Sequence, residues 1–245
     1  MARDLIDLLW RDHPGAPSGG SRGPRAKVTT SQAVDAAITL ADAEGPDAVT
    51  VRRLAGDLGV SAMALYTHVG SRDDLLVLMA DTVRARSGRP PYVSDDWRDR
   101  VRQVADEETA LHAAHWWLLD VTDQRTSFGP GTIATYDRQL HAFDGTPLTD
   151  VDRDAALTFV LDFARAAARA RRPDPHAADM AEVWASWQRR LAGYLGDEHP
   201  LAQRVGAAAG AAMNTPYSPD AARAFGLERV LDALQSLIGG VTPPR

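Results

Sequence analysis

The chain has 245 residues, a formal net charge of −6 and no cysteine. Its length suffices for one large domain or two small ones, and the lack of cysteine excludes disulfides and thiolate sites. The negative charge argues against a protein that coats nucleic acid through bulk positive charge, but it is compatible with a specific reader that presents a few local cations.

The sequence gives no sign of secretion or of membrane insertion. Asp4 and Asp7 interrupt the apolar cluster at the N-terminus and break any signal-peptide core. The longest run of small and apolar residues, 205–213, is too short to cross a bilayer. We therefore expect a cytoplasmic protein with no membrane partner.

Residues 1–27 are expected to form a flexible N-terminal arm, because residues 11–25 are rich in proline, glycine and serine. The apolar cluster Leu5, Leu8, Leu9 and Trp10 has two alternatives, since it can dock on the domain or stay loose. After Lys27 the helical pattern continues almost to the end, without strand-like alternation. The sequence predicts an all-α protein of about nine or ten helices.

Residues 28–78 carry the clearest helix signals. Thr29, Thr50, Ser61 and Ser71 are good N-capping residues, and Thr29 and Ser71 have capping-box spacing to the residue three positions later. Apolar stripes at helical spacing follow the first two caps. These stripes are Val34, Ala37, Ile38 and Ala41, and then Val51, Leu54, Ala55 and Leu58.

The short connection between the second and third of these helices is typical of a helix-turn-helix. Only Gly59 and Val60 separate the end of one stripe from the cap at Ser61. Ala55 is small enough for a close crossing, Gly59 adopts positive φ without strain, and Leu65 points into the shared core. The alternative is a purely structural helical hairpin with no role in DNA binding.

The segment Thr50–Leu76, TVRRLAGDLGVSAMALYTHVGSRDDLL, resembles the TetR family of bacterial repressors, and the likeness extends back over Ile38–Gly45. A looser likeness to the tetracycline-repressor-type C-terminal domain involves Trp97 and the Phe128–Pro130 segment. The resemblance implies a three-helix DNA-binding domain at 28–78 and a larger helical ligand-binding and dimerisation domain at 79–245. It implies a transcription regulator, most often a repressor, that a small molecule releases from its operator.

The third helix is expected to lie in the major groove of DNA. Its base-facing candidates are mostly apolar and suit thymine methyl groups; they are Ala62, Met63, Ala64 and Thr67, after the cap Ser61. Arg52 is the candidate for a guanine contact, with a solvated cation as the alternative. By the resemblance, phosphate contacts fall to Thr50, Tyr66, His68 and Arg72, although Tyr66 and His68 also suit ordinary packing. Arg22, Arg25 and Lys27 can follow the minor groove or belong to a disordered tail.

Two apolar stripes suggest a homodimer, because the resemblance places four such helices at a dimer interface. The stripes comprise Leu157 and Leu161 in one helix and Leu227, Val230, Leu231 and Leu234 in the last helix. The alternative is that both stripes serve the core of one subunit.

Aromatic residues and histidines in the larger domain are candidates for contact with a small-molecule effector. They are His112, His115, Trp116, Phe128, Tyr136, Phe163, Trp184 and Trp187. For each of them, ordinary core packing is the competing interpretation. We expect no cofactor and no catalytic residue.

One alternative function belongs to a different class. Glu108, His112 and His115 have i, i+4, i+7 spacing, so an all-helical metal-dependent enzyme is the competing hypothesis. No nucleophile motif or phosphate loop accompanies them. A third hypothesis is a helical adaptor whose helix-turn-helix binds only protein.

Overall fold

The computed structural model describes residues 4–16, 27–172, 177–213, 215 and 217–240. These residues form α-helices α1 to α11, joined by loops and short 3-10 helices η1 to η4, and they contain no strand. The expected all-α class is therefore confirmed. Within this part of the chain, no helix is both long and apolar enough to span a membrane.

Three short helices build the N-terminal head, namely α2 (Thr30–Glu44), α3 (Val51–Asp57) and α4 (Ala62–Val69). The expected caps are present, because the hydroxyls of Thr29, Thr50 and Ser61 each accept a hydrogen bond from the backbone N–H three residues later. A short 3-10 helix, η1 (Pro46–Ala48), links α2 to α3. Local hydrogen bonds thus fix where each helix of the head starts.

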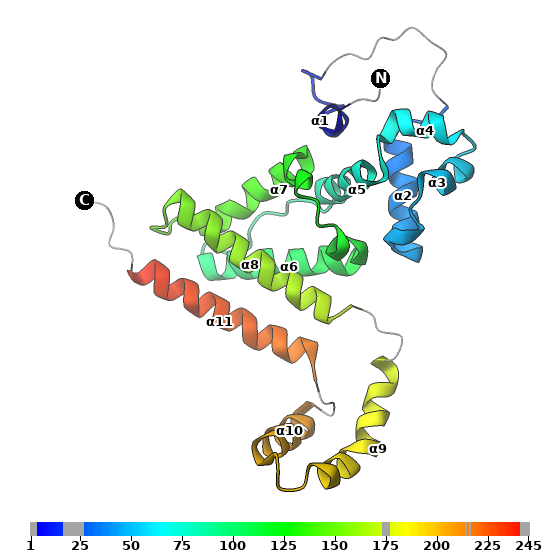
Figure 1. The fold of residues 1–245 in the computed structure, drawn as a ribbon. Coiled ribbons are helices and arrows are strands. Elements are labelled where there is room, and N and C mark those ends of the chain that lie inside the picture. The colour runs from blue at the N-terminus through cyan, green and yellow to red at the C-terminus, as the bar shows by residue number, and fades with distance from the viewer. Residues whose placement is uncertain (1–3, 17–26, 173–176, 214, 216, 241–245) are drawn as a thin grey trace.

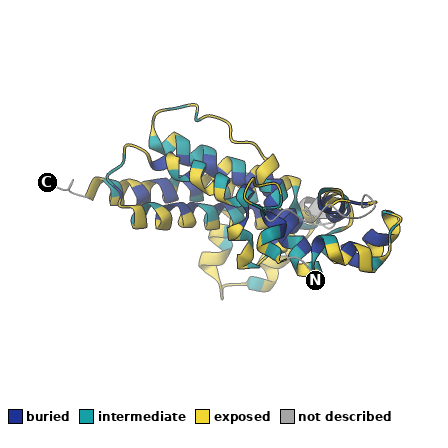
Figure 2. Ribbon diagram, turned by 90° about the horizontal axis from the view of Figure 1, so that it is seen from above, coloured by how far each residue is buried: buried dark blue, intermediate teal, exposed yellow. Residues whose placement is uncertain are grey.

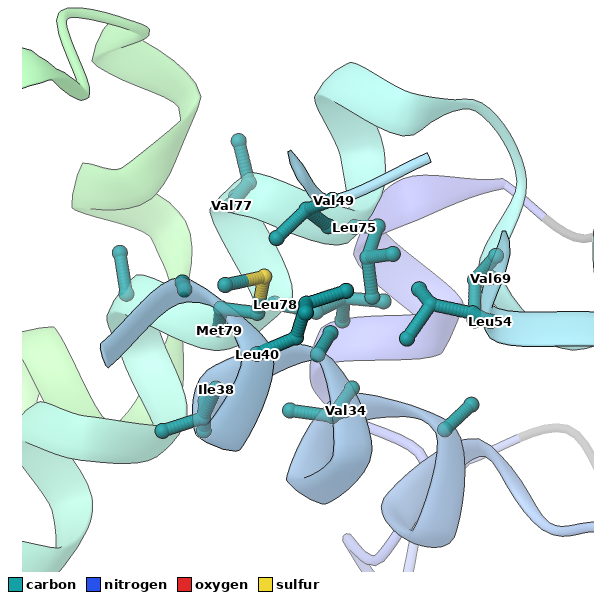
Figure 3. Close-up of a cluster of buried hydrophobic side chains, with 14 of the residues drawn as sticks. Val34, Ile38, Leu40, Val49, Leu54, Val69, Leu75, Val77, Leu78 and Met79 are labelled. Carbon is teal, nitrogen blue, oxygen red and sulfur yellow. The ribbon is translucent and has the colours of Figure 1, made fainter. Parts of the chain in front are cut away.

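Helix α5 (Arg72–Arg86) connects the head with the rest of the molecule (Figure 1). Its first turns contribute Leu75, Leu78 and Met79 to the core of the head, where they meet Val34 of α2 and Leu54 of α3 (Figure 3). Its later turns lie against α6 and α7 (Figure 1). One rigid helix therefore belongs to two parts of the fold.

The N-terminal segment is partly ordered against this core. Residues Leu5–Leu9 form helix α1, and Leu8 and Leu9 are buried with the apolar side chains of the head. The structure thus shows the docked alternative for this cluster. Burial of two leucine side chains lowers the free energy relative to a loose arm that leaves them in water. Arg22 and Arg25 lie outside the described residues.

The larger domain is built on α6 (Trp97–Ala114), α7 (Pro130–Leu140), α8 (Asp150–Ala170) and α11 (Pro219–Gly240). Between α6 and α8 come η2 (Trp116–Asp120), η3 (Gln124–Phe128) and η4 (His141–Phe143). Helices α8 and α11 lie side by side across α6 (Figure 1). Buried residues line the surfaces where these helices meet, and exposed residues occupy their outer faces (Figure 2).

The stripes predicted for the dimer interface lie in the core of the single chain. Leu157, Leu227, Val230, Leu231 and Leu234 are all buried against α6 and each other, and Leu161 packs partly buried beside them. The assignment of the five buried residues to a dimer interface is therefore corrected, because a side chain already covered within the subunit has no surface left for a partner. The alternative left open by the sequence is the one observed.

Helices α9 (Ala177–Leu195) and α10 (Pro200–Met213) form a hairpin that projects from the main body (Figure 1). Inside it, Trp184 covers Gly210 so closely that an added Cβ would lie 2.7 Å from the indole ring. Trp187 and Tyr194 are exposed on the hairpin surface.

Candidate DNA-binding surface and ligand cavity

The outer face of α4 is open to solvent. Leu65 and Val69 point into the core, and this orientation turns Met63, Ala64 and Thr67 outward, with Met63 75% exposed. The turn before α4 depends on Gly59, whose φ of 65° is strained for other residues. The predicted base-facing residues thus share one exposed face, except that Ala62 packs partly buried against the core.

Arg52 and Arg53, at the start of α3, have different environments. Arg53 donates two hydrogen bonds to the Glu44 carboxylate, at 2.7 and 2.6 Å. Arg52 is exposed and forms no ion pair within the described part of the chain. Arg52 is therefore the guanidinium of α3 that is available to an external acceptor.

The Arg72 side chain forms hydrogen bonds within the protein. Its Nε donates to the carbonyl of Val49 at 2.9 Å, and its Nη2 donates to the carbonyl of Pro46 at 2.7 Å. The guanidinium thereby holds the η1–α3 connection and places Thr50 at the start of α3. The side chain stays 39% exposed, so the phosphate contact that the resemblance implied for Arg72 stays a prediction.

Two further residues of α4 were expected to meet phosphates. Tyr66 is exposed, which disfavours its alternative role in core packing. His68 is half-buried, and its carbonyl accepts a hydrogen bond from Thr30 Oγ1 at 2.9 Å. That bond fastens the end of α4 to the start of α2 and fixes the orientation of the recognition helix.

A buried ionic cluster joins α5 to α6 below the head. Arg84 donates to both carboxylate oxygens of Glu108, at 3.0 and 3.2 Å, and His112 Nε2 lies 3.1 Å from Glu108 Oε1. Burial by itself raises the pKa of Glu108, but the nearby Arg84 charge and the His112 ring hold it well below its usual value. Glu108 is therefore an ionised carboxylate with its partners already in place.

The metal triad proposed from spacing does not form. Helix α6 ends before His115, whose backbone angles (φ −134°, ψ 71°) are not helical, so this ring leaves the face shared by Glu108 and His112. His115 Nδ1 instead contacts Asp42 Oδ1 at 2.8 Å, and the Trp117 indole donates to the same oxygen at 2.7 Å. Among the described residues no group of histidine and acidic side chains could hold a metal ion. The metal-dependent enzyme hypothesis loses its site.

The predicted effector contacts do not converge on one place. Phe128 and Trp187 are 60% and 61% exposed, and they lie on η3 and α9. Tyr136 donates its hydroxyl to Asp154 at the surface, while Phe163 packs against Gly226. Trp184 lines a cavity of about 760 Å³ within the α9–α10 hairpin, and no residue of α5 lines this cavity. Of the remaining candidates, His112 is buried, Trp116 is half-buried and His115 borders a different cavity.

That cavity has a volume of about 330 Å³ and lies between the last turns of α5, the middle of α6 and the end of α7. Its apolar wall includes Val83 and Leu111. Glu108 lines it but is buried and paired with Arg84, and Glu107 is paired with Arg138 at 2.6 Å. Two further cations border the cavity, of which Arg86 pairs with Asp35 and Arg89 is exposed without an ion pair among the described residues.

Gln139 is the residue of this cavity that sequence reasoning missed. It is only 5% exposed and lines the cavity, and its side-chain amide forms no hydrogen bond with the described residues. An amide that faces a cavity and has no protein partner is available to a ligand or to water. The available signal was the inward face of α7, which carries Gly131, Thr135 and Gln139 at i, i+4 and i+8 where apolar residues are usual.

Comparison with known proteins agrees with this architecture. Residues 33–79 match the family described as bacterial regulatory proteins, tetR family, and residues 90–238 match the tetracyclin repressor-like C-terminal domain. The chain belongs to the tetR family. It is a ligand-responsive DNA-binding transcriptional regulator, as the resemblance implied.

Relatives and solved structures extend the match over nearly the whole chain. The HTH-type transcriptional repressor DrrR1 of Streptomyces coeruleorubidus is 32% identical, and the alignment covers 97% of this chain and 87% of the relative. The crystal structure of apo ActR from Streptomyces coelicolor superposes with a TM-score of 0.71 at 25% identity, over 88% of this chain and 99% of ActR. ActR in complex with actinorhodin gives 0.69 at 24% identity, over 89% and 100%.

Proposed function

We propose that this regulator is a homodimeric repressor that holds its operator through α3 and α4 and leaves it when a small molecule fills the cavity between α5, α6 and α7. The observation that carries the proposal is the placement of that cavity. It borders the last turns of α5, the helix whose first turns lie in the core of the head. A ligand that displaces the end of α5 therefore biases the orientation of α4.

The contact with DNA is expected to be sparse. Arg52 supplies a guanidinium for a guanine edge, while Met63, Ala64 and Thr67 offer surfaces for thymine methyl groups. One short helix binds weakly, so two copies at half-sites one helical turn apart are needed for a stable complex. This requirement supports a homodimer.

The dimer interface is expected on the outer faces of α8 and α11. Exposed apolar side chains remain there after the core is formed, among them Phe159 (49% exposed) and Phe225 (67% exposed). These two helices lie side by side (Figure 1), so the same pair from a second subunit can complete a four-helix contact.

The effector is expected to be a mostly apolar molecule with at least one hydrogen-bonding oxygen. The cavity wall holds the paired carboxylates Glu107 and Glu108, the exposed guanidinium of Arg89 and the neutral amide of Gln139. The binding of actinorhodin by ActR, a structural neighbour, supports a compound of the drug-like class. A cavity of about 330 Å³ is within the usual range for small-molecule sites.

The first test is binding of the purified protein to the intergenic DNA beside its own gene, by mobility shift with excess competitor. Arg52→Ala is expected to weaken binding by about 1–3 kcal/mol, the range for one bidentate base contact. Arg189→Ala, an exposed arginine on α9, is the matched control and is expected to bind as the wild type. Absence of specific binding, followed by an empty genomic pull-down, would contradict the proposal.

The cavity is tested with Prodan, an uncharged fluorophore that has one ketone oxygen. Gln139→Leu keeps the side-chain volume but removes the amide donor, so Prodan affinity is expected to fall by about 2- to 10-fold, equivalent to one hydrogen bond of about 0.5–1.5 kcal/mol. Gln188→Leu in the α9–α10 hairpin is the control. A loss with Gln188→Leu and none with Gln139→Leu would place the probe in the hairpin and contradict the cavity assignment.

A further inference from the structure

The N-terminal end of α7 lies in unusually close contact with the middle of α5. An added Cβ on Gly131 would lie 2.3 Å from the backbone oxygen of Asp81, and one on Gly129 would lie 2.1 Å from Asp81 Oδ1. Atoms at such distances overlap, so only glycine is compatible with this packing. The two helices are therefore fitted to each other at this point without room to slide.

Asp81 caps α7 from another helix. The residue preceding α7, Gly129, has no capping side chain, and the Thr132 N–H instead donates to Asp81 Oδ1 at 2.8 Å. Asp81 is only 6% exposed. Burial raises the pKa of its carboxyl group, against the opposing effect of hydrogen bonds from Thr132 and Gly131 and of the Arg11 charge. A carboxylate in this setting is held by the positive end of α7.

Helix α1 closes the same junction from the outside. The Trp10 indole N–H donates to the carbonyl of Phe128, directly before Gly129, at 2.8 Å. The next residue, Arg11, donates to Ser31 Oγ at the start of α2 at 3.3 Å. Because Leu8 and Leu9 are buried in the core of the head, α1 ties the head to the segment that leads into α7.

This junction lies between the two functional regions. Helix α7 walls the cavity with Thr135, Arg138 and Gln139, and α5 reaches into the head. We propose that Asp81 and α1 form a coupling junction that locks α7 to α5, so that these two helices move as one body between the operator-bound and ligand-bound states. Asp81 is a positioning residue in this scheme, which rests on the proposed function of operator binding.

The test follows amide hydrogen exchange in α7 with and without bound operator DNA. Coupling between two sites is reciprocal, so operator binding at the head must reach α7 if the junction transmits the effect. In the wild type we expect exchange in residues 130–140 to change by about fivefold or more on operator binding, the lower end of usual coupling factors. Asp81→Ala is expected to bind the operator and lose this response, while Asp81→Asn, which retains an acceptor oxygen, is expected to keep most of it.

Two further variants make the experiment decisive. Asp137→Ala removes an exposed carboxylate from α7 itself and is expected to leave the response unchanged. Trp10→Phe keeps an aromatic ring but removes the indole N–H together with part of the ring system, and it is expected to reduce the response. This variant carries the test if Asp81→Ala fails to fold. The proposal is overturned if α7 of the operator-bound wild type shows no response, if Asp81→Ala and Trp10→Phe both respond as the wild type does, or if Asp137→Ala loses the response equally. A wild type that binds no operator would instead refute the proposed function, and the mobility shift detects that separately.

Discussion

The helix caps of the head and the ion pairs of the larger domain act over very different distances along the chain. In the head, the hydroxyls of Thr29, Thr50 and Ser61 bond to backbone amides three residues away. In the larger domain, Arg84 binds Glu108 across 24 positions, and Arg98 binds Asp232 across 134 positions. A cap can form as soon as its own helix forms. An ion pair between helices can form only after those helices have packed together.

This difference separates two kinds of stability. Local caps fix helix boundaries, and each contributes modestly even when the rest of the fold changes. Buried pairs such as Arg84–Glu108 depend on tertiary geometry, and removal of one partner leaves a charge without compensation. Substitutions in the two regions are therefore expected to differ in size and in their dependence on pH.

The largest effect is expected at the buried pair. Glu108→Gln leaves Arg84 buried without a counter-charge and is expected to destabilise the fold by about 3–5 kcal/mol in denaturant unfolding at neutral pH. Because folding lowers the pKa of Glu108, its stabilisation is complete above the unfolded value of 4.5 and is lost as the pH falls below that value. The variant should therefore lose stability on acidification less steeply than the wild type.

The control for this prediction is Glu198→Gln, which changes an exposed carboxylate and is expected to leave the midpoint within experimental error. A loss below about 1 kcal/mol for Glu108→Gln, typical of a surface ion pair, would show that the cluster does not stabilise the fold as described.

A smaller loss is expected where α7 meets α5. Gly131→Ala places a Cβ against the backbone of Asp81, which must shift to admit it, and overpacking of this kind costs about 1–3 kcal/mol. Gly206→Ala in α10 is the matched control, since nothing lies within 4 Å of its added Cβ. That control should gain about 0.5–1 kcal/mol from helix propensity. Equal unfolding midpoints for the two variants would disprove the close approach.

The smallest of the three effects is expected at a cap of the head. Thr50→Ala removes the acceptor for the Arg53 N–H and should cost about 1 kcal/mol. Its loss should not vary with pH between 5 and 8, because no ionisable group takes part. Thr158→Ala, an exposed position within α8, is the comparison variant. If both threonine variants unfold alike, the cap makes no special contribution.

Much of the head was predictable from the sequence. Capping residues, apolar stripes and the Gly59 turn are encoded within a few positions of one another, and the structure places them as expected. The hydrogen bonds of Arg72 within the protein were not predictable, since its acceptors at Pro46 and Val49 lie more than twenty positions away.

The cavity was harder to predict because its wall gathers residues from separate helices. Spacing put Glu108, His112 and His115 on one helical face, but the helix ends one residue before His115. Aromatic content suggested Trp184, Trp187 and Phe163, and the structure distributes them over the hairpin and the α8–α11 contact. Composition indicates how many apolar side chains a domain has but not which of them come together to line a cavity.

The sequence by itself determined the helical class, the helix-turn-helix and the starts of the helices in the head, since those signals act through hydrogen bonds and side-chain periodicity within single helices. Tertiary structure alone decided that the stripes of α8 and α11 face their own core, that Gln139 keeps a free amide in a cavity and that Asp81 caps a helix 51 positions away. The physical reason is that burial and long-range pairing depend on how helices cross, and no local pattern records the crossing.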